Sequence, residues 1–440
     1  MAAATAGIYD VIGIGIGPFN LSTAALLDGV PHLASAFFER KSAFTWHPGL
    51  LFRDALLQTS FLKDLVSFAD PTSRHSFINF LHSHRRLHQF INADFDRITR
   101  AEFTEYMSWV ASRLPNLHFG QGVEQLTHRD GLFVARIEPN LEVLCKHVVV
   151  GIGRRDRIPA CARQHLGASV FHAGRFLERI ANVPPPRTVT VVGGGQSAAE
   201  IFLHFVRSNG SGAPVNINWV TRRYNFSPLD ETPFTNEYFT PLYAEYFHGM
   251  DLGSRRDALA TQKLASDGIS SSTLREIYQE IYRAKYLERR NVNLRLLVDQ
   301  ELTDLQRVGA ESQLTFSDTK TGAPTSLTSD LVVLATGYEA FIPPFLENIA
   351  HMFEIEDGYL RLRRDFSAQW RMPCSNRLYL QNAAQQTHGV ADPNLSLMAW
   401  RSATIINSLL GYEHFQTPQS DQFIERTLSL ISQQQVKQAL

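Results

Sequence analysis

The amino-acid sequence predicts an α/β protein with two parallel sheets, each built from alternating strands and helices. Strand-like and helix-like segments alternate along most of the 440 residues, and this alternation is typical of parallel sheets. Two glycine-rich turns lie far apart in the chain, and each follows an apolar, β-prone run, at 9–12 and at 188–192. Two further apolar runs, 148–153 and 331–337, end in glycine. We expect these two runs to carry the chain between the two sheets.

The second glycine-rich turn has the residues needed to bind the pyrophosphate of a dinucleotide. Glycine allows a tight turn and a close approach to phosphate, and the helix that follows directs free N–H groups and its positive dipole end toward the charge. Gly193, Gly195 and Ala198 stand in the G-x-G-x-x-A spacing, in which the third small residue lets the helix pack on the strand. The residues between them, Gln196 and Ser197, begin the expected helix.

The first glycine-rich turn follows the same pattern with one departure. Gly13 and Gly15 are in place, but Pro18 occupies the third position, so we expect Gly17 to make the close approach. One glycine fingerprint alone also occurs at ordinary strand-to-helix turns. Two of them, in separate units, predict two Rossmann-like dinucleotide-binding domains.

The residues that end the second strand of each unit indicate which dinucleotides bind. An acidic residue there binds an unphosphorylated ribose, whereas arginine pairs with a ribose 2′-phosphate. Glu39 ends the run at 36–38, which favours FAD in the first unit. Arg222 and Arg223 follow the run at 215–220, which favours NADPH over NADH in the second.

The composition is that of an ordinary soluble globular protein and argues against several other classes. A formal net charge of −1 with 44% hydrophobic residues gives no reason to expect nucleic-acid binding. Cys145, Cys161 and Cys374 are isolated, which favours a reducing, cytoplasmic compartment. The N-terminus lacks the features of a signal peptide, and no run approaches the ~20 apolar residues of a membrane span.

The order of these signals predicts a chain that leaves the first domain and later returns to it. Three consecutive prolines at 184–186 form a stiff linker just before the second glycine-rich unit. We expect an FAD-binding domain over 1–183, an NADPH-binding domain over 184–337 that includes a small, mostly helical, substrate-facing segment at about 226–290, the return of the FAD-binding domain over 338–425, and a polar tail over 426–440.

Histidines offer candidate metal or proton-transfer sites, but a structural role is favoured for each. His84 and His88 have helical i, i+4 spacing, with His82 nearby, yet no acidic partner stands at ligand spacing. We expect a solvated helix face there and no metal site. His388 could relay protons, or be a hydrogen-bonded structural histidine.

Beyond these features, the chain resembles the microbial N-hydroxylating flavin monooxygenases, which make hydroxylamines for siderophores and so serve iron acquisition. Within them it is most similar to the L-lysine N6-monooxygenases of aerobactin-type pathways. The resemblance runs from Tyr9 to about Gly411 and includes the Pro18 departure. The motifs that carry it are Gly15–Leu21, Trp46–Gly49, Gln58 with Phe61–Leu65, Gly193–Ser197, Phe234–Glu237, Ala335–Tyr338, Thr387–Gly389 and Leu395–Leu397.

The resemblance implies a reaction. NADPH reduces FAD, O2 adds at the flavin C4a, and the resulting hydroperoxide donates its distal oxygen to a neutral primary amine. The flavin supplies the difficult chemistry, while the protein binds, orients and excludes water. The resemblance also implies a homo-oligomer, in this family often a tetramer.

The resemblance assigns roles position by position. It implies that Lys63 and Asn236 grip the carboxylate and α-amine of an amino-acid substrate. Ser396 is implied to lie near the reacting amine and the flavin, and Asp267 near the substrate or the nicotinamide. The candidate catalytic residues are Gln58, Ser396 and Asp267. FAD is expected to contact Gly13, Gly15, Gly17, Pro18, Glu39, Trp46, His47 and Gln58. NADPH is expected to contact Gly193, Gly195, Gln196, Ser197, Arg222 and Arg223.

Lys63 bears most directly on the substrate. A lysine in a cleft needs an anionic partner, which a substrate carboxylate supplies; the alternatives are a pair with Asp64 or a solvated lysine. The similarity to lysine rather than ornithine enzymes rests on residues 229–231, 266–268 and 391–393. L-Lysine is therefore the expected substrate, and the alternative is a diamine such as cadaverine, putrescine or diaminopropane, or another primary amine.

Other flavoprotein classes fit less well. A flavin disulfide reductase needs a C-x-x-C pair, which the sequence lacks. A non-catalytic FAD-binding regulator would need no second nucleotide site. A carbon- or sulfur-oxidising flavin monooxygenase shares the plan of two turns, and only the motifs at 61–65 and 387–389 separate it, by resemblance.

Overall fold

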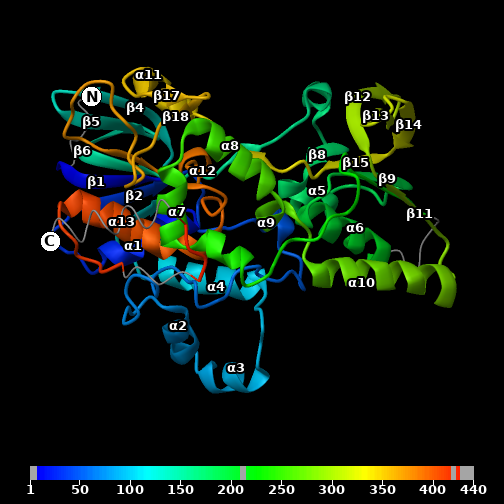
Figure 1. Ribbon diagram of the computed structural model, residues 1–440, viewed down its shortest axis with the longest axis horizontal. Helices are drawn as coiled ribbons and strands as arrows, with labels where there is room; N and C mark the ends of the chain where they lie inside the picture. The colour runs from blue at the N-terminus through cyan, green and yellow to red at the C-terminus, as the bar shows by residue number, and fades with distance from the viewer. Residues whose placement is uncertain (1–6, 209–214, 418–422, 427–440) are drawn as a thin grey trace.

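The computed structural model describes residues 7–208, 215–417 and 423–426, and they form two lobes, each with its own parallel sheet (Figure 1). We call them the first lobe, around the sheet that contains the N-terminal strand, and the second lobe. The expected α/β class with two Rossmann-like units is confirmed. Most of the polar tail expected over 426–440 lies outside the described residues.

The first lobe is built on a seven-stranded sheet in the order β3-β2-β1-β6-β5-β4, with β19 added beside β6. The strands next to β1 run parallel to it, whereas β5 is antiparallel to both of its neighbours, β4 and β6. The order of the strands reverses between β1 and β6. This reversal places a crevice at the carboxyl ends of these two strands, where nucleotides bind in such sheets. The strand bounds are β1 Tyr9–Ile14, β2 Ser35–Glu39, β3 Leu117–Phe119, β4 Val123–Arg129, β5 Leu132–Ile137, β6 Leu141–Val150 and β19 Leu378–Leu380.

Helix α1 (Pro18–Leu27) forms the centre of the first lobe, and all ten of its residues are buried. Pro18 is its first residue, where the backbone N–H has no partner within the helix, so a proline costs nothing. This explains how the first turn keeps its function with proline in the third position. Helix α13 (Met398–Leu410) packs along α1, and α4 (Arg100–Ala111) also contacts it.

The second lobe repeats the arrangement with the order β11-β10-β9-β15-β8, all parallel. Helices α6 and α10 cover one face of this sheet, and the antiparallel sheet β12–β14 covers the other. The bounds are β8 Val170–His172, β9 Thr188–Val192, β10 Val215–Val220, β11 Val292–Leu297, β12 Gln300–Val308, β13 Glu311–Asp318, β14 Pro324–Ser329, β15 Leu331–Leu334, α5 Phe176–Ile180, α6 Gln196–Ser208 and α10 Ser271–Tyr282.

The chain crosses between the lobes at two short paired strands, β7 (Arg155–Asp156) and β16 (Tyr338–Glu339). Both expected connecting runs are therefore in place. The first boundary differs from the one expected at residue 184, because β8 already hydrogen-bonds to β15 of the second sheet. The proline linker lies inside the second lobe, between α5 and β9. We propose domain boundaries near residues 156 and 338.

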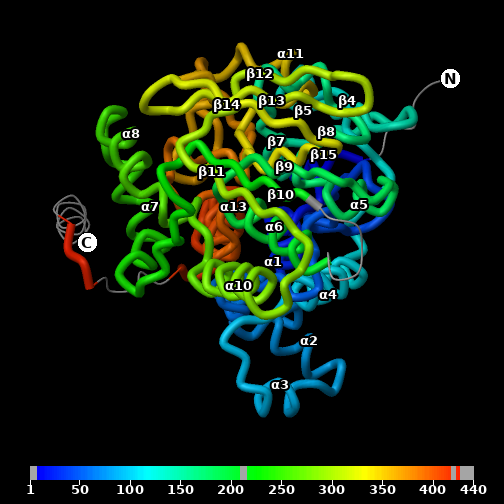
Figure 2. The backbone as a smooth tube through the Cα atoms, turned by 90° about the vertical axis from the view of Figure 1, so that its right-hand side faces the viewer, coloured from blue at the N-terminus to red at the C-terminus, as the bar shows by residue number. Residues whose placement is uncertain are grey.

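The remaining helices lie around and between the lobes. Helices α2 and α3 project from the first lobe in both Figure 1 and Figure 2. The expected single helical face with His84 and His88 is wrong: α2 ends at Ser83, Arg85 has a φ of 56°, and His88 belongs to α3. The bounds are α2 Phe77–Ser83, α3 Leu87–Ala93, α7 Pro241–His248, α8 Leu252–Thr261, α9 Leu264–Asp267, α11 Glu347–Ala350 and α12 Gln385–His388, with small strands β17 Ile355–Glu356 and β18 Tyr359–Leu360. None of the helices in the described ranges has the length and apolarity to cross a membrane.

Candidate active site

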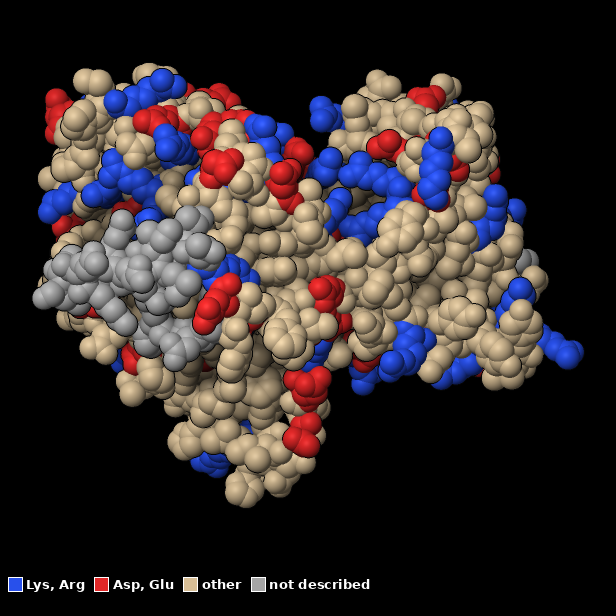
Figure 3. All heavy atoms as spheres, viewed as in Figure 1, with Lys and Arg blue, Asp and Glu red and all other residues tan. Residues whose placement is uncertain are grey.

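A cleft of about 1770 Å³ lies between the two lobes, and both glycine-rich turns line it. Figure 3 shows lysine and arginine side chains gathered around a hollow between the lobes. Nine lysines and arginines line the cleft against six acidic residues, which makes it a positively charged site in a nearly neutral protein. The volume exceeds the ~300–1000 Å³ of a single small-molecule site, so two dinucleotides can meet in it.

The first turn needs glycine at two positions for different reasons. Gly15 has a φ of +84°, and a Cβ there would lie 2.8 Å from the carbonyl oxygen of Gly151. Gly13 lies within β1, where a Cβ would collide with the ring of Phe37. A Cβ at Gly17 would lie 3.6 Å from its nearest neighbour in the protein. Space therefore remains in front of Gly17 and the N-terminus of α1, as the close approach of a phosphate requires.

Glu39 ends β2 beside this turn, as expected from the sequence. Its Oε2 accepts a hydrogen bond from the backbone N–H of Ile16 at 2.9 Å, and its Oε1 accepts one from Lys41 at 3.0 Å. The carboxylate thus stands at the rim of the cleft within the reach of the turn.

Asn20 is a structural residue of this turn that reasoning from the fingerprint did not single out. It is fully buried, and its amide donates to the carbonyl oxygens of Ile14, Gly15 and Val149 at 3.2, 2.8 and 3.2 Å. Its Oδ1 accepts from Gln381 at 2.7 Å. Asn20 therefore joins β1, β6 and the returning segment after β19. The signal in the sequence was an asparagine two residues after the proline of the turn.

In the second turn, too, one glycine is required by close packing and another leaves space for a ligand. Gly193 has a φ of +151°, and a Cβ there would lie 2.1 Å from the carbonyl oxygen of Ala335. A Cβ at Gly195 would have one neighbour, at 3.8 Å, so the space before α6 is open. The side chain of Gln196 is engaged with Glu200, Ser270 and Thr273. Only its backbone, with Ser197, is available to a phosphate.

Cations cluster beyond the second turn, at the end of β10. Arg223 donates to the carbonyl oxygens of Gly194 and Asp267 at 3.0 and 2.7 Å, and Arg222 pairs with Glu301 at 3.2 Å. Lys263, which the sequence did not indicate, also lines the cleft here. Burial, followed by the charge of Arg223, lowers the pKa of Lys263. The ammonium group of Lys263 bonds to no residue that the structure describes.

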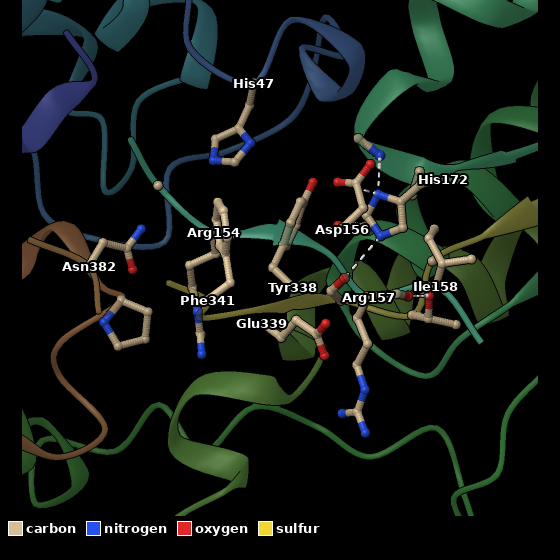
Figure 4. A pocket seen from close by; sticks show the side chains of 18 of the residues that line it. His47, Arg154, Asp156, Arg157, Ile158, His172, Tyr338, Glu339, Phe341 and Asn382 are labelled. Carbon is tan, nitrogen blue, oxygen red and sulfur yellow. Dashed lines mark hydrogen bonds and ion pairs between the residues drawn. The ribbon is translucent and has the colours of Figure 1, made fainter. Parts of the chain in front are cut away.

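The connecting strands bring an aromatic cluster into the cleft (Figure 4). The ring of Tyr338 lies between His47, at 6.3 Å, and His172, at 5.0 Å between centroids. His172 lies 3.1 Å from Asp156 through Nδ1, and its Nε2 lies 3.0 Å from the carbonyl oxygen of Gly337. Burial, followed by the charge of Asp156, raises the pKa of Tyr338 to about 12, so its phenol stays protonated.

The residues expected around the flavin line the same part of the cleft. Trp46, His47 and Gln58 all border it. His47 has a left-handed backbone, with φ 46°, and its side chain is surrounded by the protein at the cleft while remaining accessible from it. Burial, followed by the charges of Arg100 and Lys41, lowers the pKa of His47 to about 4. The imidazole is therefore neutral at physiological pH.

The expected substrate residues fall in three different places. Lys63 is half-buried outside the lining of the cleft, and burial lowers its pKa. Asn236 is exposed in the second of five residues of a short helix at Thr235–Phe239. Ser396 is buried in a turn at Leu395–Leu397, and its hydroxyl has no partner among the described residues. Asp267 borders the cleft near Gly195, on the side of the second turn.

The structure removes one alternative for Lys63. The carboxylate of Asp64 is buried and accepts four hydrogen bonds, from the backbone of Val66, Ser67 and Phe77 and from the hydroxyl of Ser67, at 2.7–2.9 Å. It forms no ion pair with Lys63, whose ammonium group has no partner in the part of the chain that the structure describes.

Two motifs expected to distinguish lysine from ornithine enzymes have structural contacts. Asp392 forms an ion pair with Arg401 at 3.2 Å, and both side chains are about 1% exposed. Glu231 pairs with Arg97 and accepts from the backbone of Ser271. Neither residue lines the cleft.

His388 is held as a structural histidine. Its Nδ1 lies 2.9 Å from the hydroxyl of Thr387, its Nε2 lies 3.3 Å from the carbonyl oxygen of Arg364, and its ring stacks on Phe366 at 4.1 Å. It does not line the cleft. The described residues contain no group of three histidine, cysteine or acidic side chains that could hold a metal ion.

Comparison with known proteins decides the family. Residues 7–340 match the L-lysine 6-monooxygenase/L-ornithine 5-monooxygenase family. The chain belongs to this family. It is therefore a flavin-dependent N-monooxygenase, as its resemblance implied.

Three members show how close the similarity is. The L-lysine N6-monooxygenase of Escherichia coli is 39% identical over 92% of this chain and 95% of its own. The FAD-bound cadaverine monooxygenase of desferrioxamine biosynthesis from Erwinia amylovora superposes with a TM-score of 0.89, at 31% identity, over 95% of this chain and 98% of its own. An ornithine N-hydroxylase from Kutzneria sp. 744, with reduced FAD, NADP+ and L-ornithine, gives a TM-score of 0.85 at 29% identity, over 92% and 99%.

Proposed function

We propose that this monooxygenase hydroxylates the side-chain amine of L-lysine, with FAD in the first lobe and NADPH in the second, for the biosynthesis of a hydroxamate siderophore. The observation that carries the choice of lysine is the ammonium group of Lys63, which has no partner among the residues that the structure describes. A half-buried cation without a counter-charge is unfavourable. The carboxylate of an amino acid would supply that charge, whereas a diamine would not.

The residues of the cleft fit both cofactors. Gly17 and Gly195 leave room for a pyrophosphate at the start of α1 and α6, and the carboxylate of Glu39 would accept a hydrogen bond from a ribose hydroxyl. Arg222, Arg223 and Lys263 supply positive charge for a 2′-phosphate. When bound and reduced, FAD supplies the activation of O2.

The protein must deliver the amine without its proton and keep water away. An alkyl ammonium group titrates near ~10.4 in water, and desolvation lowers that value. The buried hydroxyl of Ser396 has a free hydrogen-bonding capacity for the neutral amine. The protonated phenol of Tyr338 adds no negative charge that would hold the amine in its ammonium form.

Hydroxylation of a diamine is the second candidate. It is supported by the cadaverine monooxygenase that superposes on this chain, and by the position of Lys63 and Asn236 outside the lining of the cleft. Both candidates use the same cofactors and the same oxygen chemistry, so only the amine distinguishes them.

The test compares hydroxylamine formation with NADPH oxidation for L-lysine, L-ornithine, cadaverine, putrescine and diaminopropane, with FAD added. We expect product mainly from L-lysine, and we expect Lys63→Ala to raise KM for lysine at least tenfold with a smaller effect on kcat. Lys285→Ala, which removes an exposed lysine beside Tyr286, is the matched control. Product from a diamine, with lysine inert, would transfer the assignment to the second candidate.

A further inference from the structure

The two lobes are joined by a segment of the first lobe that enters the core of the second. Leu50 is buried in the apolar cluster around α6, and Phe52 packs there with ring centroids 5.7 Å from Phe176 and 5.6 Å from His204. Gly49 lies so close to Gly174 that a Cβ would be 2.2 Å from its carbonyl oxygen. This segment directly follows His47, so the flavin side of the cleft and the second lobe share one piece of chain.

Arg100, the first residue of α4, holds this segment from the first lobe. Its Nη1 donates to the carbonyl oxygen of Leu50 at 3.2 Å, and its Nε donates to that of Leu56 at 3.3 Å. Its Nη2 forms an ion pair with Glu200 on α6 of the second lobe. The side chains of Arg100 and Glu200 are 13% and 7% exposed, so the pair is largely shielded from water.

Glu200 extends the network to the NADPH side of the cleft. Its Oε1 also accepts from the amide of Gln196 at 2.8 Å, and Gln196 is the first residue of α6. The same amide donates to Thr273 at 3.1 Å, and its oxygen accepts from the backbone of Ser270 at 2.9 Å. The side chains of Glu200 and Gln196 thus connect the guanidinium of Arg100 to the start of α10.

A second ion pair links the first lobe to α10 independently of Arg100. Arg97, three residues before Arg100, pairs with Glu231, whose other oxygen accepts from the backbone of Ser271 at 3.1 Å. The start of α4 and the segment before it therefore reach the N-terminal end of α10 by two routes, of which only the first passes through α6.

We propose that Arg100 and Glu200 are positioning residues that set the distance between the flavin side of the cleft and the N-terminus of α6. The proposal rests on the proposed binding of FAD in the first lobe and NADPH in the second. The step it serves is the transfer of a hydride, two electrons and one proton, from NADPH, which becomes NADP+, to FAD, which takes a further proton from water.

The ion pair of Arg100 and Glu200 contributes more to the orientation of the two lobes than to the stability of the protein. A shielded ion pair loses much of its Coulombic gain to desolvation, and well-packed apolar residues often replace such a pair without loss of stability. Its direction and length are nevertheless specific. Hydride transfer needs reacting atoms about 3–3.5 Å apart, and a displacement of about 1 Å costs roughly a hundredfold in rate. A small rotation of the second lobe is therefore enough to slow reduction.

The test uses the full-length protein and separates rate from affinity. We expect Glu200→Leu and the double variant Arg100→Met with Glu200→Leu to slow anaerobic reduction of FAD by NADPH at least thirtyfold. The dissociation constants of FAD and NADP+, measured by calorimetry, should stay within threefold. Small-angle X-ray scattering of the FAD-free protein should show altered spacing of the lobes. Glu200→Gln, which keeps an acceptor oxygen for Arg100, should restore part of the rate.

The matched control is Glu276→Leu, which breaks the pair of Arg207 and Glu276. That pair also starts from α6, but it ends on α10 within the same lobe, and both side chains are exposed. We expect its reduction rate to stay within twofold of the unmodified enzyme. A rate within twofold for the double variant, which leaves no buried charge behind, would overturn the positioning role. Failure of NADPH to reduce the unmodified enzyme would instead overturn the proposed function.

Discussion

Gly15 and Gly17 lie two residues apart in the first turn, and the structure predicts opposite consequences for the same substitution. Gly15→Ala forces a side chain onto a φ of +84° and places its Cβ 2.8 Å from the carbonyl oxygen of Gly151. Backbone strain of this kind costs about 1–3 kcal/mol, and overpacking adds about 1–3 kcal/mol. At Gly17 the φ is −88° and the nearest atom lies at 3.6 Å. There only the preference for glycine over alanine at the N-cap is lost, about 0.5–1 kcal/mol.

The assay is thermal unfolding of the FAD-free protein, followed by titration with FAD. A loss of about 3 kcal/mol lowers Tm by roughly 6–12 °C in a lobe of about 200 residues, so Gly15→Ala should melt far below the parent. Gly17→Ala should melt within about 4 °C of it. Its methyl group would nevertheless occupy the space reserved for the pyrophosphate, so its Kd for FAD should rise at least about tenfold, or 1.4 kcal/mol.

Gly167→Ala serves as the control, since a Cβ there meets no atom within 4 Å. If Gly15→Ala melted within 2 °C of the parent, the reasoning from strain would be refuted. If Gly17→Ala bound FAD as tightly as the parent, the pyrophosphate would not approach Gly17.

Three further predictions address charge. Lys263→Met should raise the Kd for NADP+ about tenfold, as expected for a lost charged contact of about 1.4 kcal/mol. Calorimetry should show no change in the Kd for NAD+. The control Lys320→Met should change the Kd of neither dinucleotide. Asp392→Asn should reduce the free energy of unfolding by about 3–5 kcal/mol in urea, because it leaves Arg401 buried without its counter-charge; Asp357→Asn, at an exposed pair, should leave unfolding unchanged. Burial keeps the pKa of His388 well below its usual value, so as the pH falls below about 6.5 only the unfolded chain gains that proton, and stability falls by up to about 1.4 kcal/mol per pH unit. His388→Gln should flatten this acid slope between pH 8 and 5, while exposed His351→Gln should not; equal slopes in all three proteins would contradict the assignment.

Local signals in the sequence predicted the parts of the site that local chemistry determines. Glycine spacing and the residue at the end of the next strand lie within about 30 residues of one another, so both turns, Glu39 and the arginines after β10 were found. Asn20 bonds to Val149 and Gln381, far away in the chain, and Lys263 reaches the cleft only because the chain folds, so no spacing rule describes either residue. The proline linker predicts a domain boundary at residue 184, whereas the structure places it inside the second lobe; a stiff segment inside a lobe and one between lobes have the same composition.

The charge of the cleft bears on the choice between lysine and a diamine, and the net charge of the chain does not reveal it. The chain has a net charge of −1, yet nine cationic and six acidic side chains line its cleft. Before cofactors bind, such a cleft attracts anionic dinucleotides and repels cations. At neutral pH lysine carries one net positive charge and a diamine carries two, so the repulsion is greater for the diamine unless the cofactor phosphates cancel it.

The salt dependence of amine binding therefore tests whether the cleft stays positively charged. The distance over which salt screens charges falls from roughly 20 Å at about 0.02 M salt to roughly 6 Å at about 0.3 M. If the cleft keeps a positive field with both cofactors bound, raising the salt should improve the binding of cadaverine several-fold more than that of lysine, measured as KM or as an inhibition constant. Equal salt dependence for the two amines would mean that the cofactors neutralise the cleft. Discrimination would then have to come from a direct contact with the carboxylate, as proposed for Lys63, and Lys63→Ala should abolish it.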